Sequence, residues 1–283
     1  MKIIEGTPQF SASDLVGYLS CNHSSMLDIQ VANGSLKKPS YYDPLLEILR
    51  ERGQLHETAF IEHLKAQGKD VVLIEGVDIN DKAVEDTLNS MKSGAEIIVQ
   101  AALRDGQWVG RADILRKIDT PSALGNWSYE VIDTKLARET KGGSILQLCL
   151  YADLLDKIQG IAPEFIYIVS PWSDYEPQAF RYADFAAYYR QAKSSAFSTL
   201  TADELLETYP DPKLHCDICR WQNDCDAKHR EDDHLCLVAN ISKLQINELF
   251  NSSGRFLAVL EAFCSPSRSS LVNYEAKHHF GAK

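Results

Sequence analysis

The middle of the chain has the pattern of two apolar strands joined by a tight turn, and this pattern constrains the fold most. Residues 95–118, AEIIVQAALRDGQWVGRADILRKI, place apolar runs on both sides of an RDG turn. Such a pattern is typical of an antiparallel strand pair. A further strand is predicted shortly afterwards over 127–137, WSYEVIDTKLA.

Helical and strand patterns alternate around this strand pair. The strongest predicted helix covers 41–68 and is expected to be one long helix or two helices hinged near Gly53. The order of elements, a helix, a meander of strands, a helix and more strands, predicts an α/β fold with a mixed central sheet and helices on both faces. The other predicted helices cover 14–21, 81–94, 142–160, 184–206 and 241–250, and the other predicted strands cover 70–76, 164–170 and 176–183.

Composition fits an ordinary globular protein, because 45% of the 283 residues are hydrophobic and 24% are charged. Membrane spans need about 18 or more consecutive apolar residues, and no such run occurs. The first residues also lack the basic and apolar segments of a signal peptide. We therefore expect a cytoplasmic protein with no membrane partner.

The net charge limits how this chain can bind nucleic acid. Its 29 Lys and Arg residues are outnumbered by 40 Asp and Glu, giving a formal charge of -11. The overall field therefore repels a polyanion. A nucleic acid partner would have to be held by a local basic groove, by metal ions or by another protein, and its binding would weaken steeply with salt.

Three of the seven cysteines lie within CDICRWQNDC, where Cys216, Cys219 and Cys225 have C-x2-C-x5-C spacing. An odd number of unevenly spaced cysteines favours metal binding or redox chemistry in a reducing compartment over a disulfide framework. Adding His229 gives C-x2-C-x5-C-x3-H, a set that could close locally around zinc. The alternative is a cluster whose fourth ligand lies elsewhere in the chain.

Two carboxylates are predicted to converge on the sheet. Side chains alternate faces along a strand, so Asp133 and Lys135 point the same way. If the strand containing Asp113 pairs with this one, the two aspartates can approach each other. Converging carboxylates raise each other's pKa or bind a hard divalent cation. The simpler alternative is a surface ion pair between Asp133 and Lys135, which contributes little.

Three further polar residues are placed by helical spacing. Gln147 and Tyr151 are four residues apart and share a helix face, which is also what an ordinary polar face would show. His56 lies on the long helix after Gly53 and could equally be a solvated histidine.

Taken in chain order, these residues resemble the motifs of a known superfamily. His56 in GQLHE, Asp113 in GRAD, Asp133 and Lys135 in VIDTK, and Gln147 and Tyr151 in QLCLY resemble the RecB-like branch of the PD-(D/E)XK nucleases. The resemblance covers residues 10–250. The third motif reads Asp-Thr-Lys where Glu-X-Lys is commoner, which keeps the carboxylate but shortens it.

The resemblance implies a restriction-endonuclease-like core and a metal-dependent nuclease. The expected reaction is hydrolysis of phosphodiester bonds in single-stranded or unwound DNA, in repair, recombination or CRISPR-type defence. Lys135 would position or deprotonate the attacking water, and Gln147 and Tyr151 would orient this lysine. The resemblance assigns Mg²⁺ or Mn²⁺ to His56, Asp113, Asp133 and the carbonyl of Thr134.

The iron-sulfur branch of the superfamily, which includes CRISPR-associated exonucleases and AddB, has one cysteine before the nuclease core and three after it. The resemblance therefore implies a [4Fe-4S] cluster that closes a nuclease domain over 1–235 like a clasp. A short helical extension over 236–264 and a disordered tail over 265–283 would follow, and a helicase is a possible partner. The implied cluster ligands are Cys21, Cys216, Cys219 and Cys225.

Two other functions remain open from the sequence. The first is a catalytically inactive iron-sulfur module that binds DNA or docks on a helicase, and the second is a zinc-containing RNA-binding protein. Trp108 and Trp221 could stack on bases or lie in the core, and the oligomeric state is undetermined. Four basic residues flank the predicted site and are expected either to contact phosphates or to be solvated surface charges. They are Arg111, Lys117, Arg138 and Lys141.

Overall fold

The computed structural model describes residues 1–40, 43–202 and 207–253. The chain divides into two compact units, Met1–Tyr209 and Pro210–Lys283, which are described separately below. The boundary lies where the sequence becomes rich in Pro, His, Cys and charge. The predicted tail over 265–283, and the predicted extension beyond residue 253, lie outside the described residues.

The first unit contains a six-stranded sheet in the order β3-β4-β5-β6-β7-β8. β3 is parallel to β4 and β6 is parallel to β7, whereas the other neighbours are antiparallel. This confirms the predicted mixed sheet. Its strands are β3 (Val71–Leu73), β4 (Ile97–Asp105), β5 (Trp108–Ile118), β6 (Ser128–Thr134), β7 (Phe165–Val169) and β8 (Gln178–Arg181).

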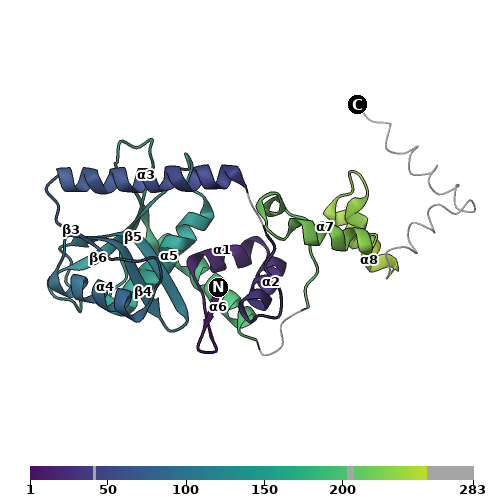
Figure 1. Ribbon diagram of the computed structural model, residues 1–283, viewed down its shortest axis with the longest axis horizontal. Helices are drawn as coiled ribbons and strands as arrows, with labels where there is room; N and C mark the ends of the chain where they lie inside the picture. Colours follow the sequence, from purple (N-terminus) through teal and green to yellow (C-terminus); the bar gives the residue numbers. More distant parts are fainter. Residues whose placement is uncertain (41–42, 203–206, 254–283) are drawn as a thin grey trace, which may run out of the picture. The chain divides into compact units, whose positions relative to one another are not determined.

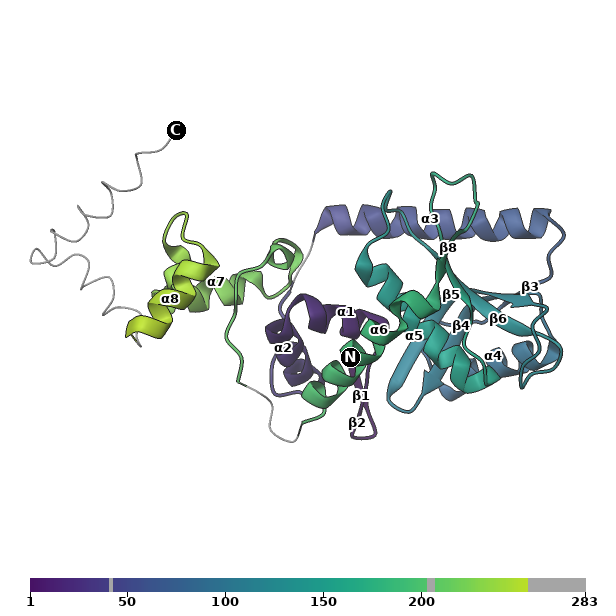
Figure 2. The same cartoon turned by 180° about the vertical axis from the view of Figure 1, so that it is seen from behind.

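Helices cover both faces of this sheet, as predicted (Figures 1 and 2). α3 (Pro44–Ala66) lies on one face, where Phe60 and Leu64 pack against apolar side chains of β4, β5, β6 and β7. The opposite face is covered by α4 (Asp81–Ser93) and α5 (Gly142–Gln159). α5 is buried over most of its length because α1 (Ala12–Ser20) and α6 (Tyr182–Leu200) also pack on it.

α3 runs through Gly53 as a single helix, so the hinge considered at this position is not observed. Glycine inside a helix costs about 1 kcal/mol relative to alanine, and neighbouring contacts can compensate for this cost. The Asp43 side chain caps the start of the helix by accepting the amide of Leu45. Further along, His56 and Phe60 are buried four residues apart and hold the helix on the sheet.

The start of the chain contains elements that the sequence patterns did not predict. β1 (Lys2–Ile4) and β2 (Thr7–Gln9) form a hairpin. α1 was predicted and begins with a capping box between Ser11 and Asp14. α2 (Asn22–Ala32) was missed because its apolar residues are spread around the helix rather than gathered on one face.

The second unit consists of short helices. Its elements are η1 (Leu214–Ile218), α7 (Gln222–Glu231), η2 (Leu235–Leu237) and α8 (Lys243–Ser253). α8 was predicted, whereas α7 was not. Trp221 is buried at the start of α7. Among the residues described, every helix is too short or too polar to span a lipid bilayer.

Candidate active site

The hydrogen-bonded ladder between β5 and β6 stops beside a pair of aspartates. The last paired residues are Ile114 and Ile132, so continuing the register would place Asp113 opposite Asp133. Instead, the Asp113 carboxylate accepts hydrogen bonds from the amide and the hydroxyl of Thr134, at 2.9 and 3.0 Å. A carboxylate thus takes the place of a backbone acceptor at the end of the ladder.

Asp133 is fully buried, with 0% of its surface exposed. Gln147 Nε2 donates to its Oδ1 over 3.2 Å. Lys135 Nζ forms an ion pair with Oδ2 over 2.7 Å, and no other donor reaches this oxygen within the described chain. Burial and the neighbouring Asp113 carboxylate raise the pKa of Asp133 to about 8. A divalent cation would relieve the repulsion between the two carboxylates.

α5 supports this carboxylate through Gln147, from the face of the sheet on which Val131 packs. The Gln147 side chain that reaches Asp133 also donates to the Tyr151 hydroxyl over 3.0 Å, so the two residues share a face as predicted. The Tyr151 ring packs closely on β5, where a Cβ at Gly110 would lie 2.6 Å from it. Only glycine at position 110 leaves room for this ring.

His56 is tied to the same strand ends through one carbonyl group. Its Nε2 lies 3.0 Å from the oxygen of Val169, and since a carbonyl can only accept, Nε2 carries the proton. The Lys135 amide donates to the same oxygen, also over 3.0 Å. The lone pair of the imidazole is therefore on Nδ1, which is the arrangement that metal-binding histidines use.

Glu57 is a third carboxylate near the site, and it was not predicted as a site residue. Its pKa is raised by burial and by the charge of Asp113, while Gln100 Nε2 donates to its Oε1. Gln100 lies in the middle of β4 with a left-handed φ of 55°. The sequence signal for Glu57 was its position directly after His56 on the helix.

The pairing between β4 and β5 is also interrupted at Asp113. It joins Val99 to Ile114 and Ala101 to Ala112, with a break at Gln100 and Asp113. The turned carbonyl of Gln100 accepts from the Arg111 guanidinium over 2.6 Å. The backbone at Asp113 therefore departs from regular pairing with both β4 and β6, and its carboxylate accepts hydrogen bonds from Thr134.

The predicted phosphate contacts differ in their surroundings. Arg111 donates to backbone carbonyls of Gln100 and Asp78, and Lys117 donates to the carbonyl of Gly94, so both have structural partners. Arg138 instead lies over the ring of Trp172, 4.7 Å from its centroid. The Lys141 backbone forms the N-cap of α5, and Trp108 lies in the core.

The four predicted iron-sulfur ligands belong to different units. Cys21 is buried in the first unit, where it joins α1 to α2. The other three, Cys216, Cys219 and Cys225, are partly exposed in the second unit. Ligation of a cluster by all four therefore stays a prediction.

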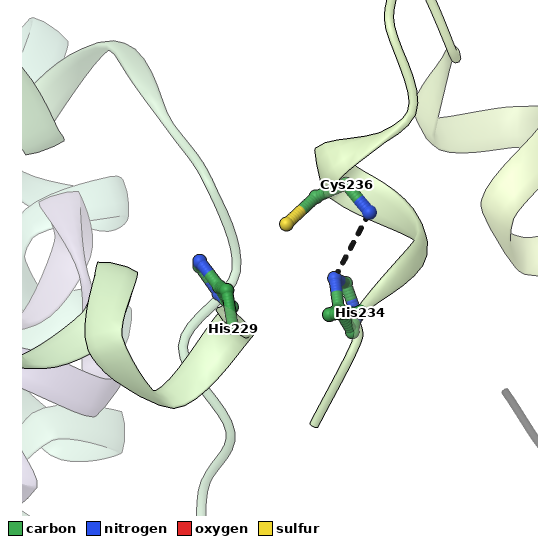
Figure 3. A group of neighbouring side chains, drawn as sticks. All are labelled: His229, His234 and Cys236. Carbon is green, nitrogen blue, oxygen red and sulfur yellow. Dashed lines mark hydrogen bonds between the residues drawn. The ribbon is translucent and has the colours of Figure 1, made fainter. Parts of the chain in front are cut away.

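His229 lies beside His234 and Cys236, and their ligand atoms are all within 4.8 Å of one another (Figure 3). No other three His, Cys, Asp or Glu side chains are this tightly grouped in the described part of the chain. Within the described residues, His56, Asp113 and Asp133 do not form so tight a group, and neither do the three cysteines of the C-x2-C-x5-C segment.

Comparisons with known proteins do not identify this chain. No family model matches it, and no curated protein matches it. A solved structure described as "Crystal structure of SSO0001" aligns with a TM-score of 0.36 and 15% sequence identity, covering 80% of this chain and 89% of that one. Likeness at this level supports no conclusion about fold or function.

Proposed function

We propose that the chain is a metal-dependent DNA nuclease of the RecB-like PD-(D/E)XK type, which hydrolyses phosphodiester bonds in single-stranded or unwound DNA. The observation that carries this proposal is the fully buried Asp133 carboxylate, which is paired with Lys135 and whose pKa is raised by burial and by the neighbouring Asp113 carboxylate. Burying such a group is costly for stability, and the proposed metal site gives this cost a function.

The donor types near the two aspartates suit a hard divalent cation. Asp113, Asp133 and the carbonyl of Thr134 offer oxygen ligands, and His56 offers a nitrogen whose partner nitrogen is already hydrogen-bonded. Oxygen ligands with one imidazole suit Mg²⁺ or Mn²⁺. Glu57 adds a further carboxylate. A bound ion of this kind lowers the pKa of water and polarises a phosphate group.

The remaining residues act on the substrate or on each other. Lys135 has a partly exposed side chain that reaches Asp133, so its ammonium group can orient the attacking water and stabilise charge that develops on the phosphate. Gln147 fixes the orientation of Asp133, and Tyr151 in turn fixes Gln147. These two are positioning residues.

The exposed pair of Arg138 and Trp172 is our proposed contact for the DNA strand. Both residues follow the carboxyl ends of neighbouring parallel strands, β6 and β7, which is the sheet edge that carries Lys135. Trp172 is 62% exposed, and exposed aromatic rings stack on the bases of single strands. The guanidinium of Arg138 would contact a phosphate.

The nuclease proposal predicts cleavage that depends on a divalent cation. Protein purified without oxygen is incubated with end-labelled single-stranded and duplex DNA in the presence of Mg²⁺, Mn²⁺ or EDTA. Asp113→Asn is expected to lower cleavage at least about 100-fold, because it removes a ligand of the activating ion. If the folded wild-type protein binds DNA but cleaves none of these substrates, the chain is instead a docking module of a helicase and nuclease complex.

We also propose that Cys21, Cys216, Cys219 and Cys225 hold a [4Fe-4S] cluster, since four thiolates are the usual donor set for one. Cys21→Ala is expected to lose iron and visible absorbance, whereas Cys149→Ala, a change at a fully buried core cysteine, keeps both. Iron retained in Cys21→Ala and lost in His229→Ala would overturn this assignment.

A further inference from the structure

We propose that His229, His234 and Cys236 form a zinc-binding site within the second unit, separate from the sheet carboxylates and from the proposed cluster ligands. All three lie in a stretch of eight residues that begins in the last turns of α7 and ends in η2. Their ligand atoms lie within 4.8 Å of one another and surround a common space (Figure 3).

The backbone between α7 and η2 turns back sharply and brings these side chains together. Asp233 has a left-handed φ of 48°, and the amide of His234 donates to the carbonyl of His229 over 2.9 Å. The two imidazole rings are consequently stacked, with centroids 5.2 Å apart. Both histidines are buried, so a metal bound at their ring nitrogens would be largely shielded from water.

The hydrogen bonds of His229 resemble those of a metal ligand. Its Nε2 lies 2.8 Å from the carbonyl oxygen of Pro210, so this nitrogen carries the proton and the lone pair is on Nδ1. Histidines that bind metals commonly donate their other ring nitrogen to a backbone carbonyl in this way. Asp226 Oδ1 lies 4.0 Å from Nδ1 and could supply an oxygen ligand.

On metal binding, His234 would lose one hydrogen bond at Nδ1 and gain a bond to the metal at the same nitrogen. Its Nδ1 accepts the amide of Cys236 over 3.1 Å (Figure 3), which fixes the start of η2. Zinc at Nδ1 would replace this N–H···N hydrogen bond, so the metal would take over the role of holding the turn closed. The expected role is therefore structural.

Zinc is the metal that this donor set favours. Two imidazoles and one thiolate are typical zinc ligands, and a carboxylate or water would complete a tetrahedral site. His229 is also part of the C-x2-C-x5-C-x3-H pattern, and it can serve only one zinc ion. Its observed neighbours, His234 and Cys236, favour the site proposed here.

The test measures zinc bound to the full-length protein by mass spectrometry after dialysis against a zinc buffer. We expect about one equivalent in the wild type, and zinc affinity at least about tenfold weaker in His234→Ala and Cys236→Ser. Cys149→Ala and His63→Ala are the matched controls, since each removes one thiol or imidazole outside both the proposed zinc site and the proposed cluster ligands, and both are expected to retain zinc. Because the readout is metal content, its result is independent of nuclease activity.

Cobalt substitution provides a measurement on the unmodified chain. The difference spectrum after Co²⁺ addition should show tetrahedral visible bands and the charge-transfer absorbance of a single thiolate. The proposal is overturned by absorbance of three thiolates, by loss of zinc in Cys216→Ser with retention in Cys236→Ser, or by a wild-type protein that binds no zinc.

Discussion

Lys135→Ala is expected to lower the rate of DNA cleavage by about 10²–10³-fold, the usual effect of removing one preorganised donor to developing charge. In the structure, Lys135 Nζ lies 2.7 Å from a buried oxygen of Asp133, so the ammonium group is held where the reaction would take place. DNA affinity should stay within a few-fold of the wild type, because a single surface cation contributes little to binding of a long polyanion.

Single-turnover cleavage at saturating protein separates the chemical step from binding. DNA affinity is measured in parallel by fluorescence anisotropy with Ca²⁺ in place of Mg²⁺. Lys92→Ala, at an exposed lysine on α4, is the matched control and should cleave normally. An unchanged rate in Lys135→Ala, or a loss of affinity as large as the loss of rate, would show that this lysine has no catalytic role.

Asp133→Asn is expected to abolish cleavage and yet stabilise the metal-free protein at neutral and alkaline pH. Burial and Asp113 raise the pKa of Asp133 from 3.8 to about 8 in the folded state, so the folded protein binds this proton more tightly than the unfolded chain does. Folding stability is therefore lost progressively as the pH rises from about 4 to 8. Asparagine carries no charge and avoids this loss.

Thermal unfolding at pH 5, 7 and 9 in the presence of a chelator measures this effect. The Tm of Asp133→Asn should exceed that of the wild type by about 5 °C or more at pH 9, with a smaller difference at pH 5. Mn²⁺ should stabilise the wild type more than the variant, because the metal site is lost.

A second buried carboxylate provides the control for this comparison. Glu130 is buried and paired over 3.2 Å with the partly exposed Arg116, so Glu130→Gln breaks this ion pair and should destabilise the protein. A higher Tm for Asp133→Asn together with a lower Tm for Glu130→Gln would distinguish a carboxylate placed for metal binding from one placed for stability. A lower Tm for Asp133→Asn at pH 9 would contradict the assignment.

The sequence by itself predicted the sheet and most of the helices around it. The paired strands β4 and β5, the strand β6 and the helix α5 follow from apolar periodicity and turn residues, which are properties of neighbours along the chain. The convergence of Asp113 on the Asp133 strand could be anticipated for the same reason, since it depends on strand alternation and pairing. The shared face of Gln147 and Tyr151 depends only on helical spacing.

Only the tertiary structure revealed the other members of the two sites. Glu57 comes close to Asp113 because α3 packs on the sheet and Gln100 turns toward it, and no local pattern encodes a contact among three separate elements. Likewise, Arg111 has backbone partners that its sequence neighbours do not indicate. The grouping of His229, His234 and Cys236 depends on a left-handed residue in a turn. Side-chain contacts of this kind depend on how whole elements pack, whereas the elements themselves are specified by local periodicity.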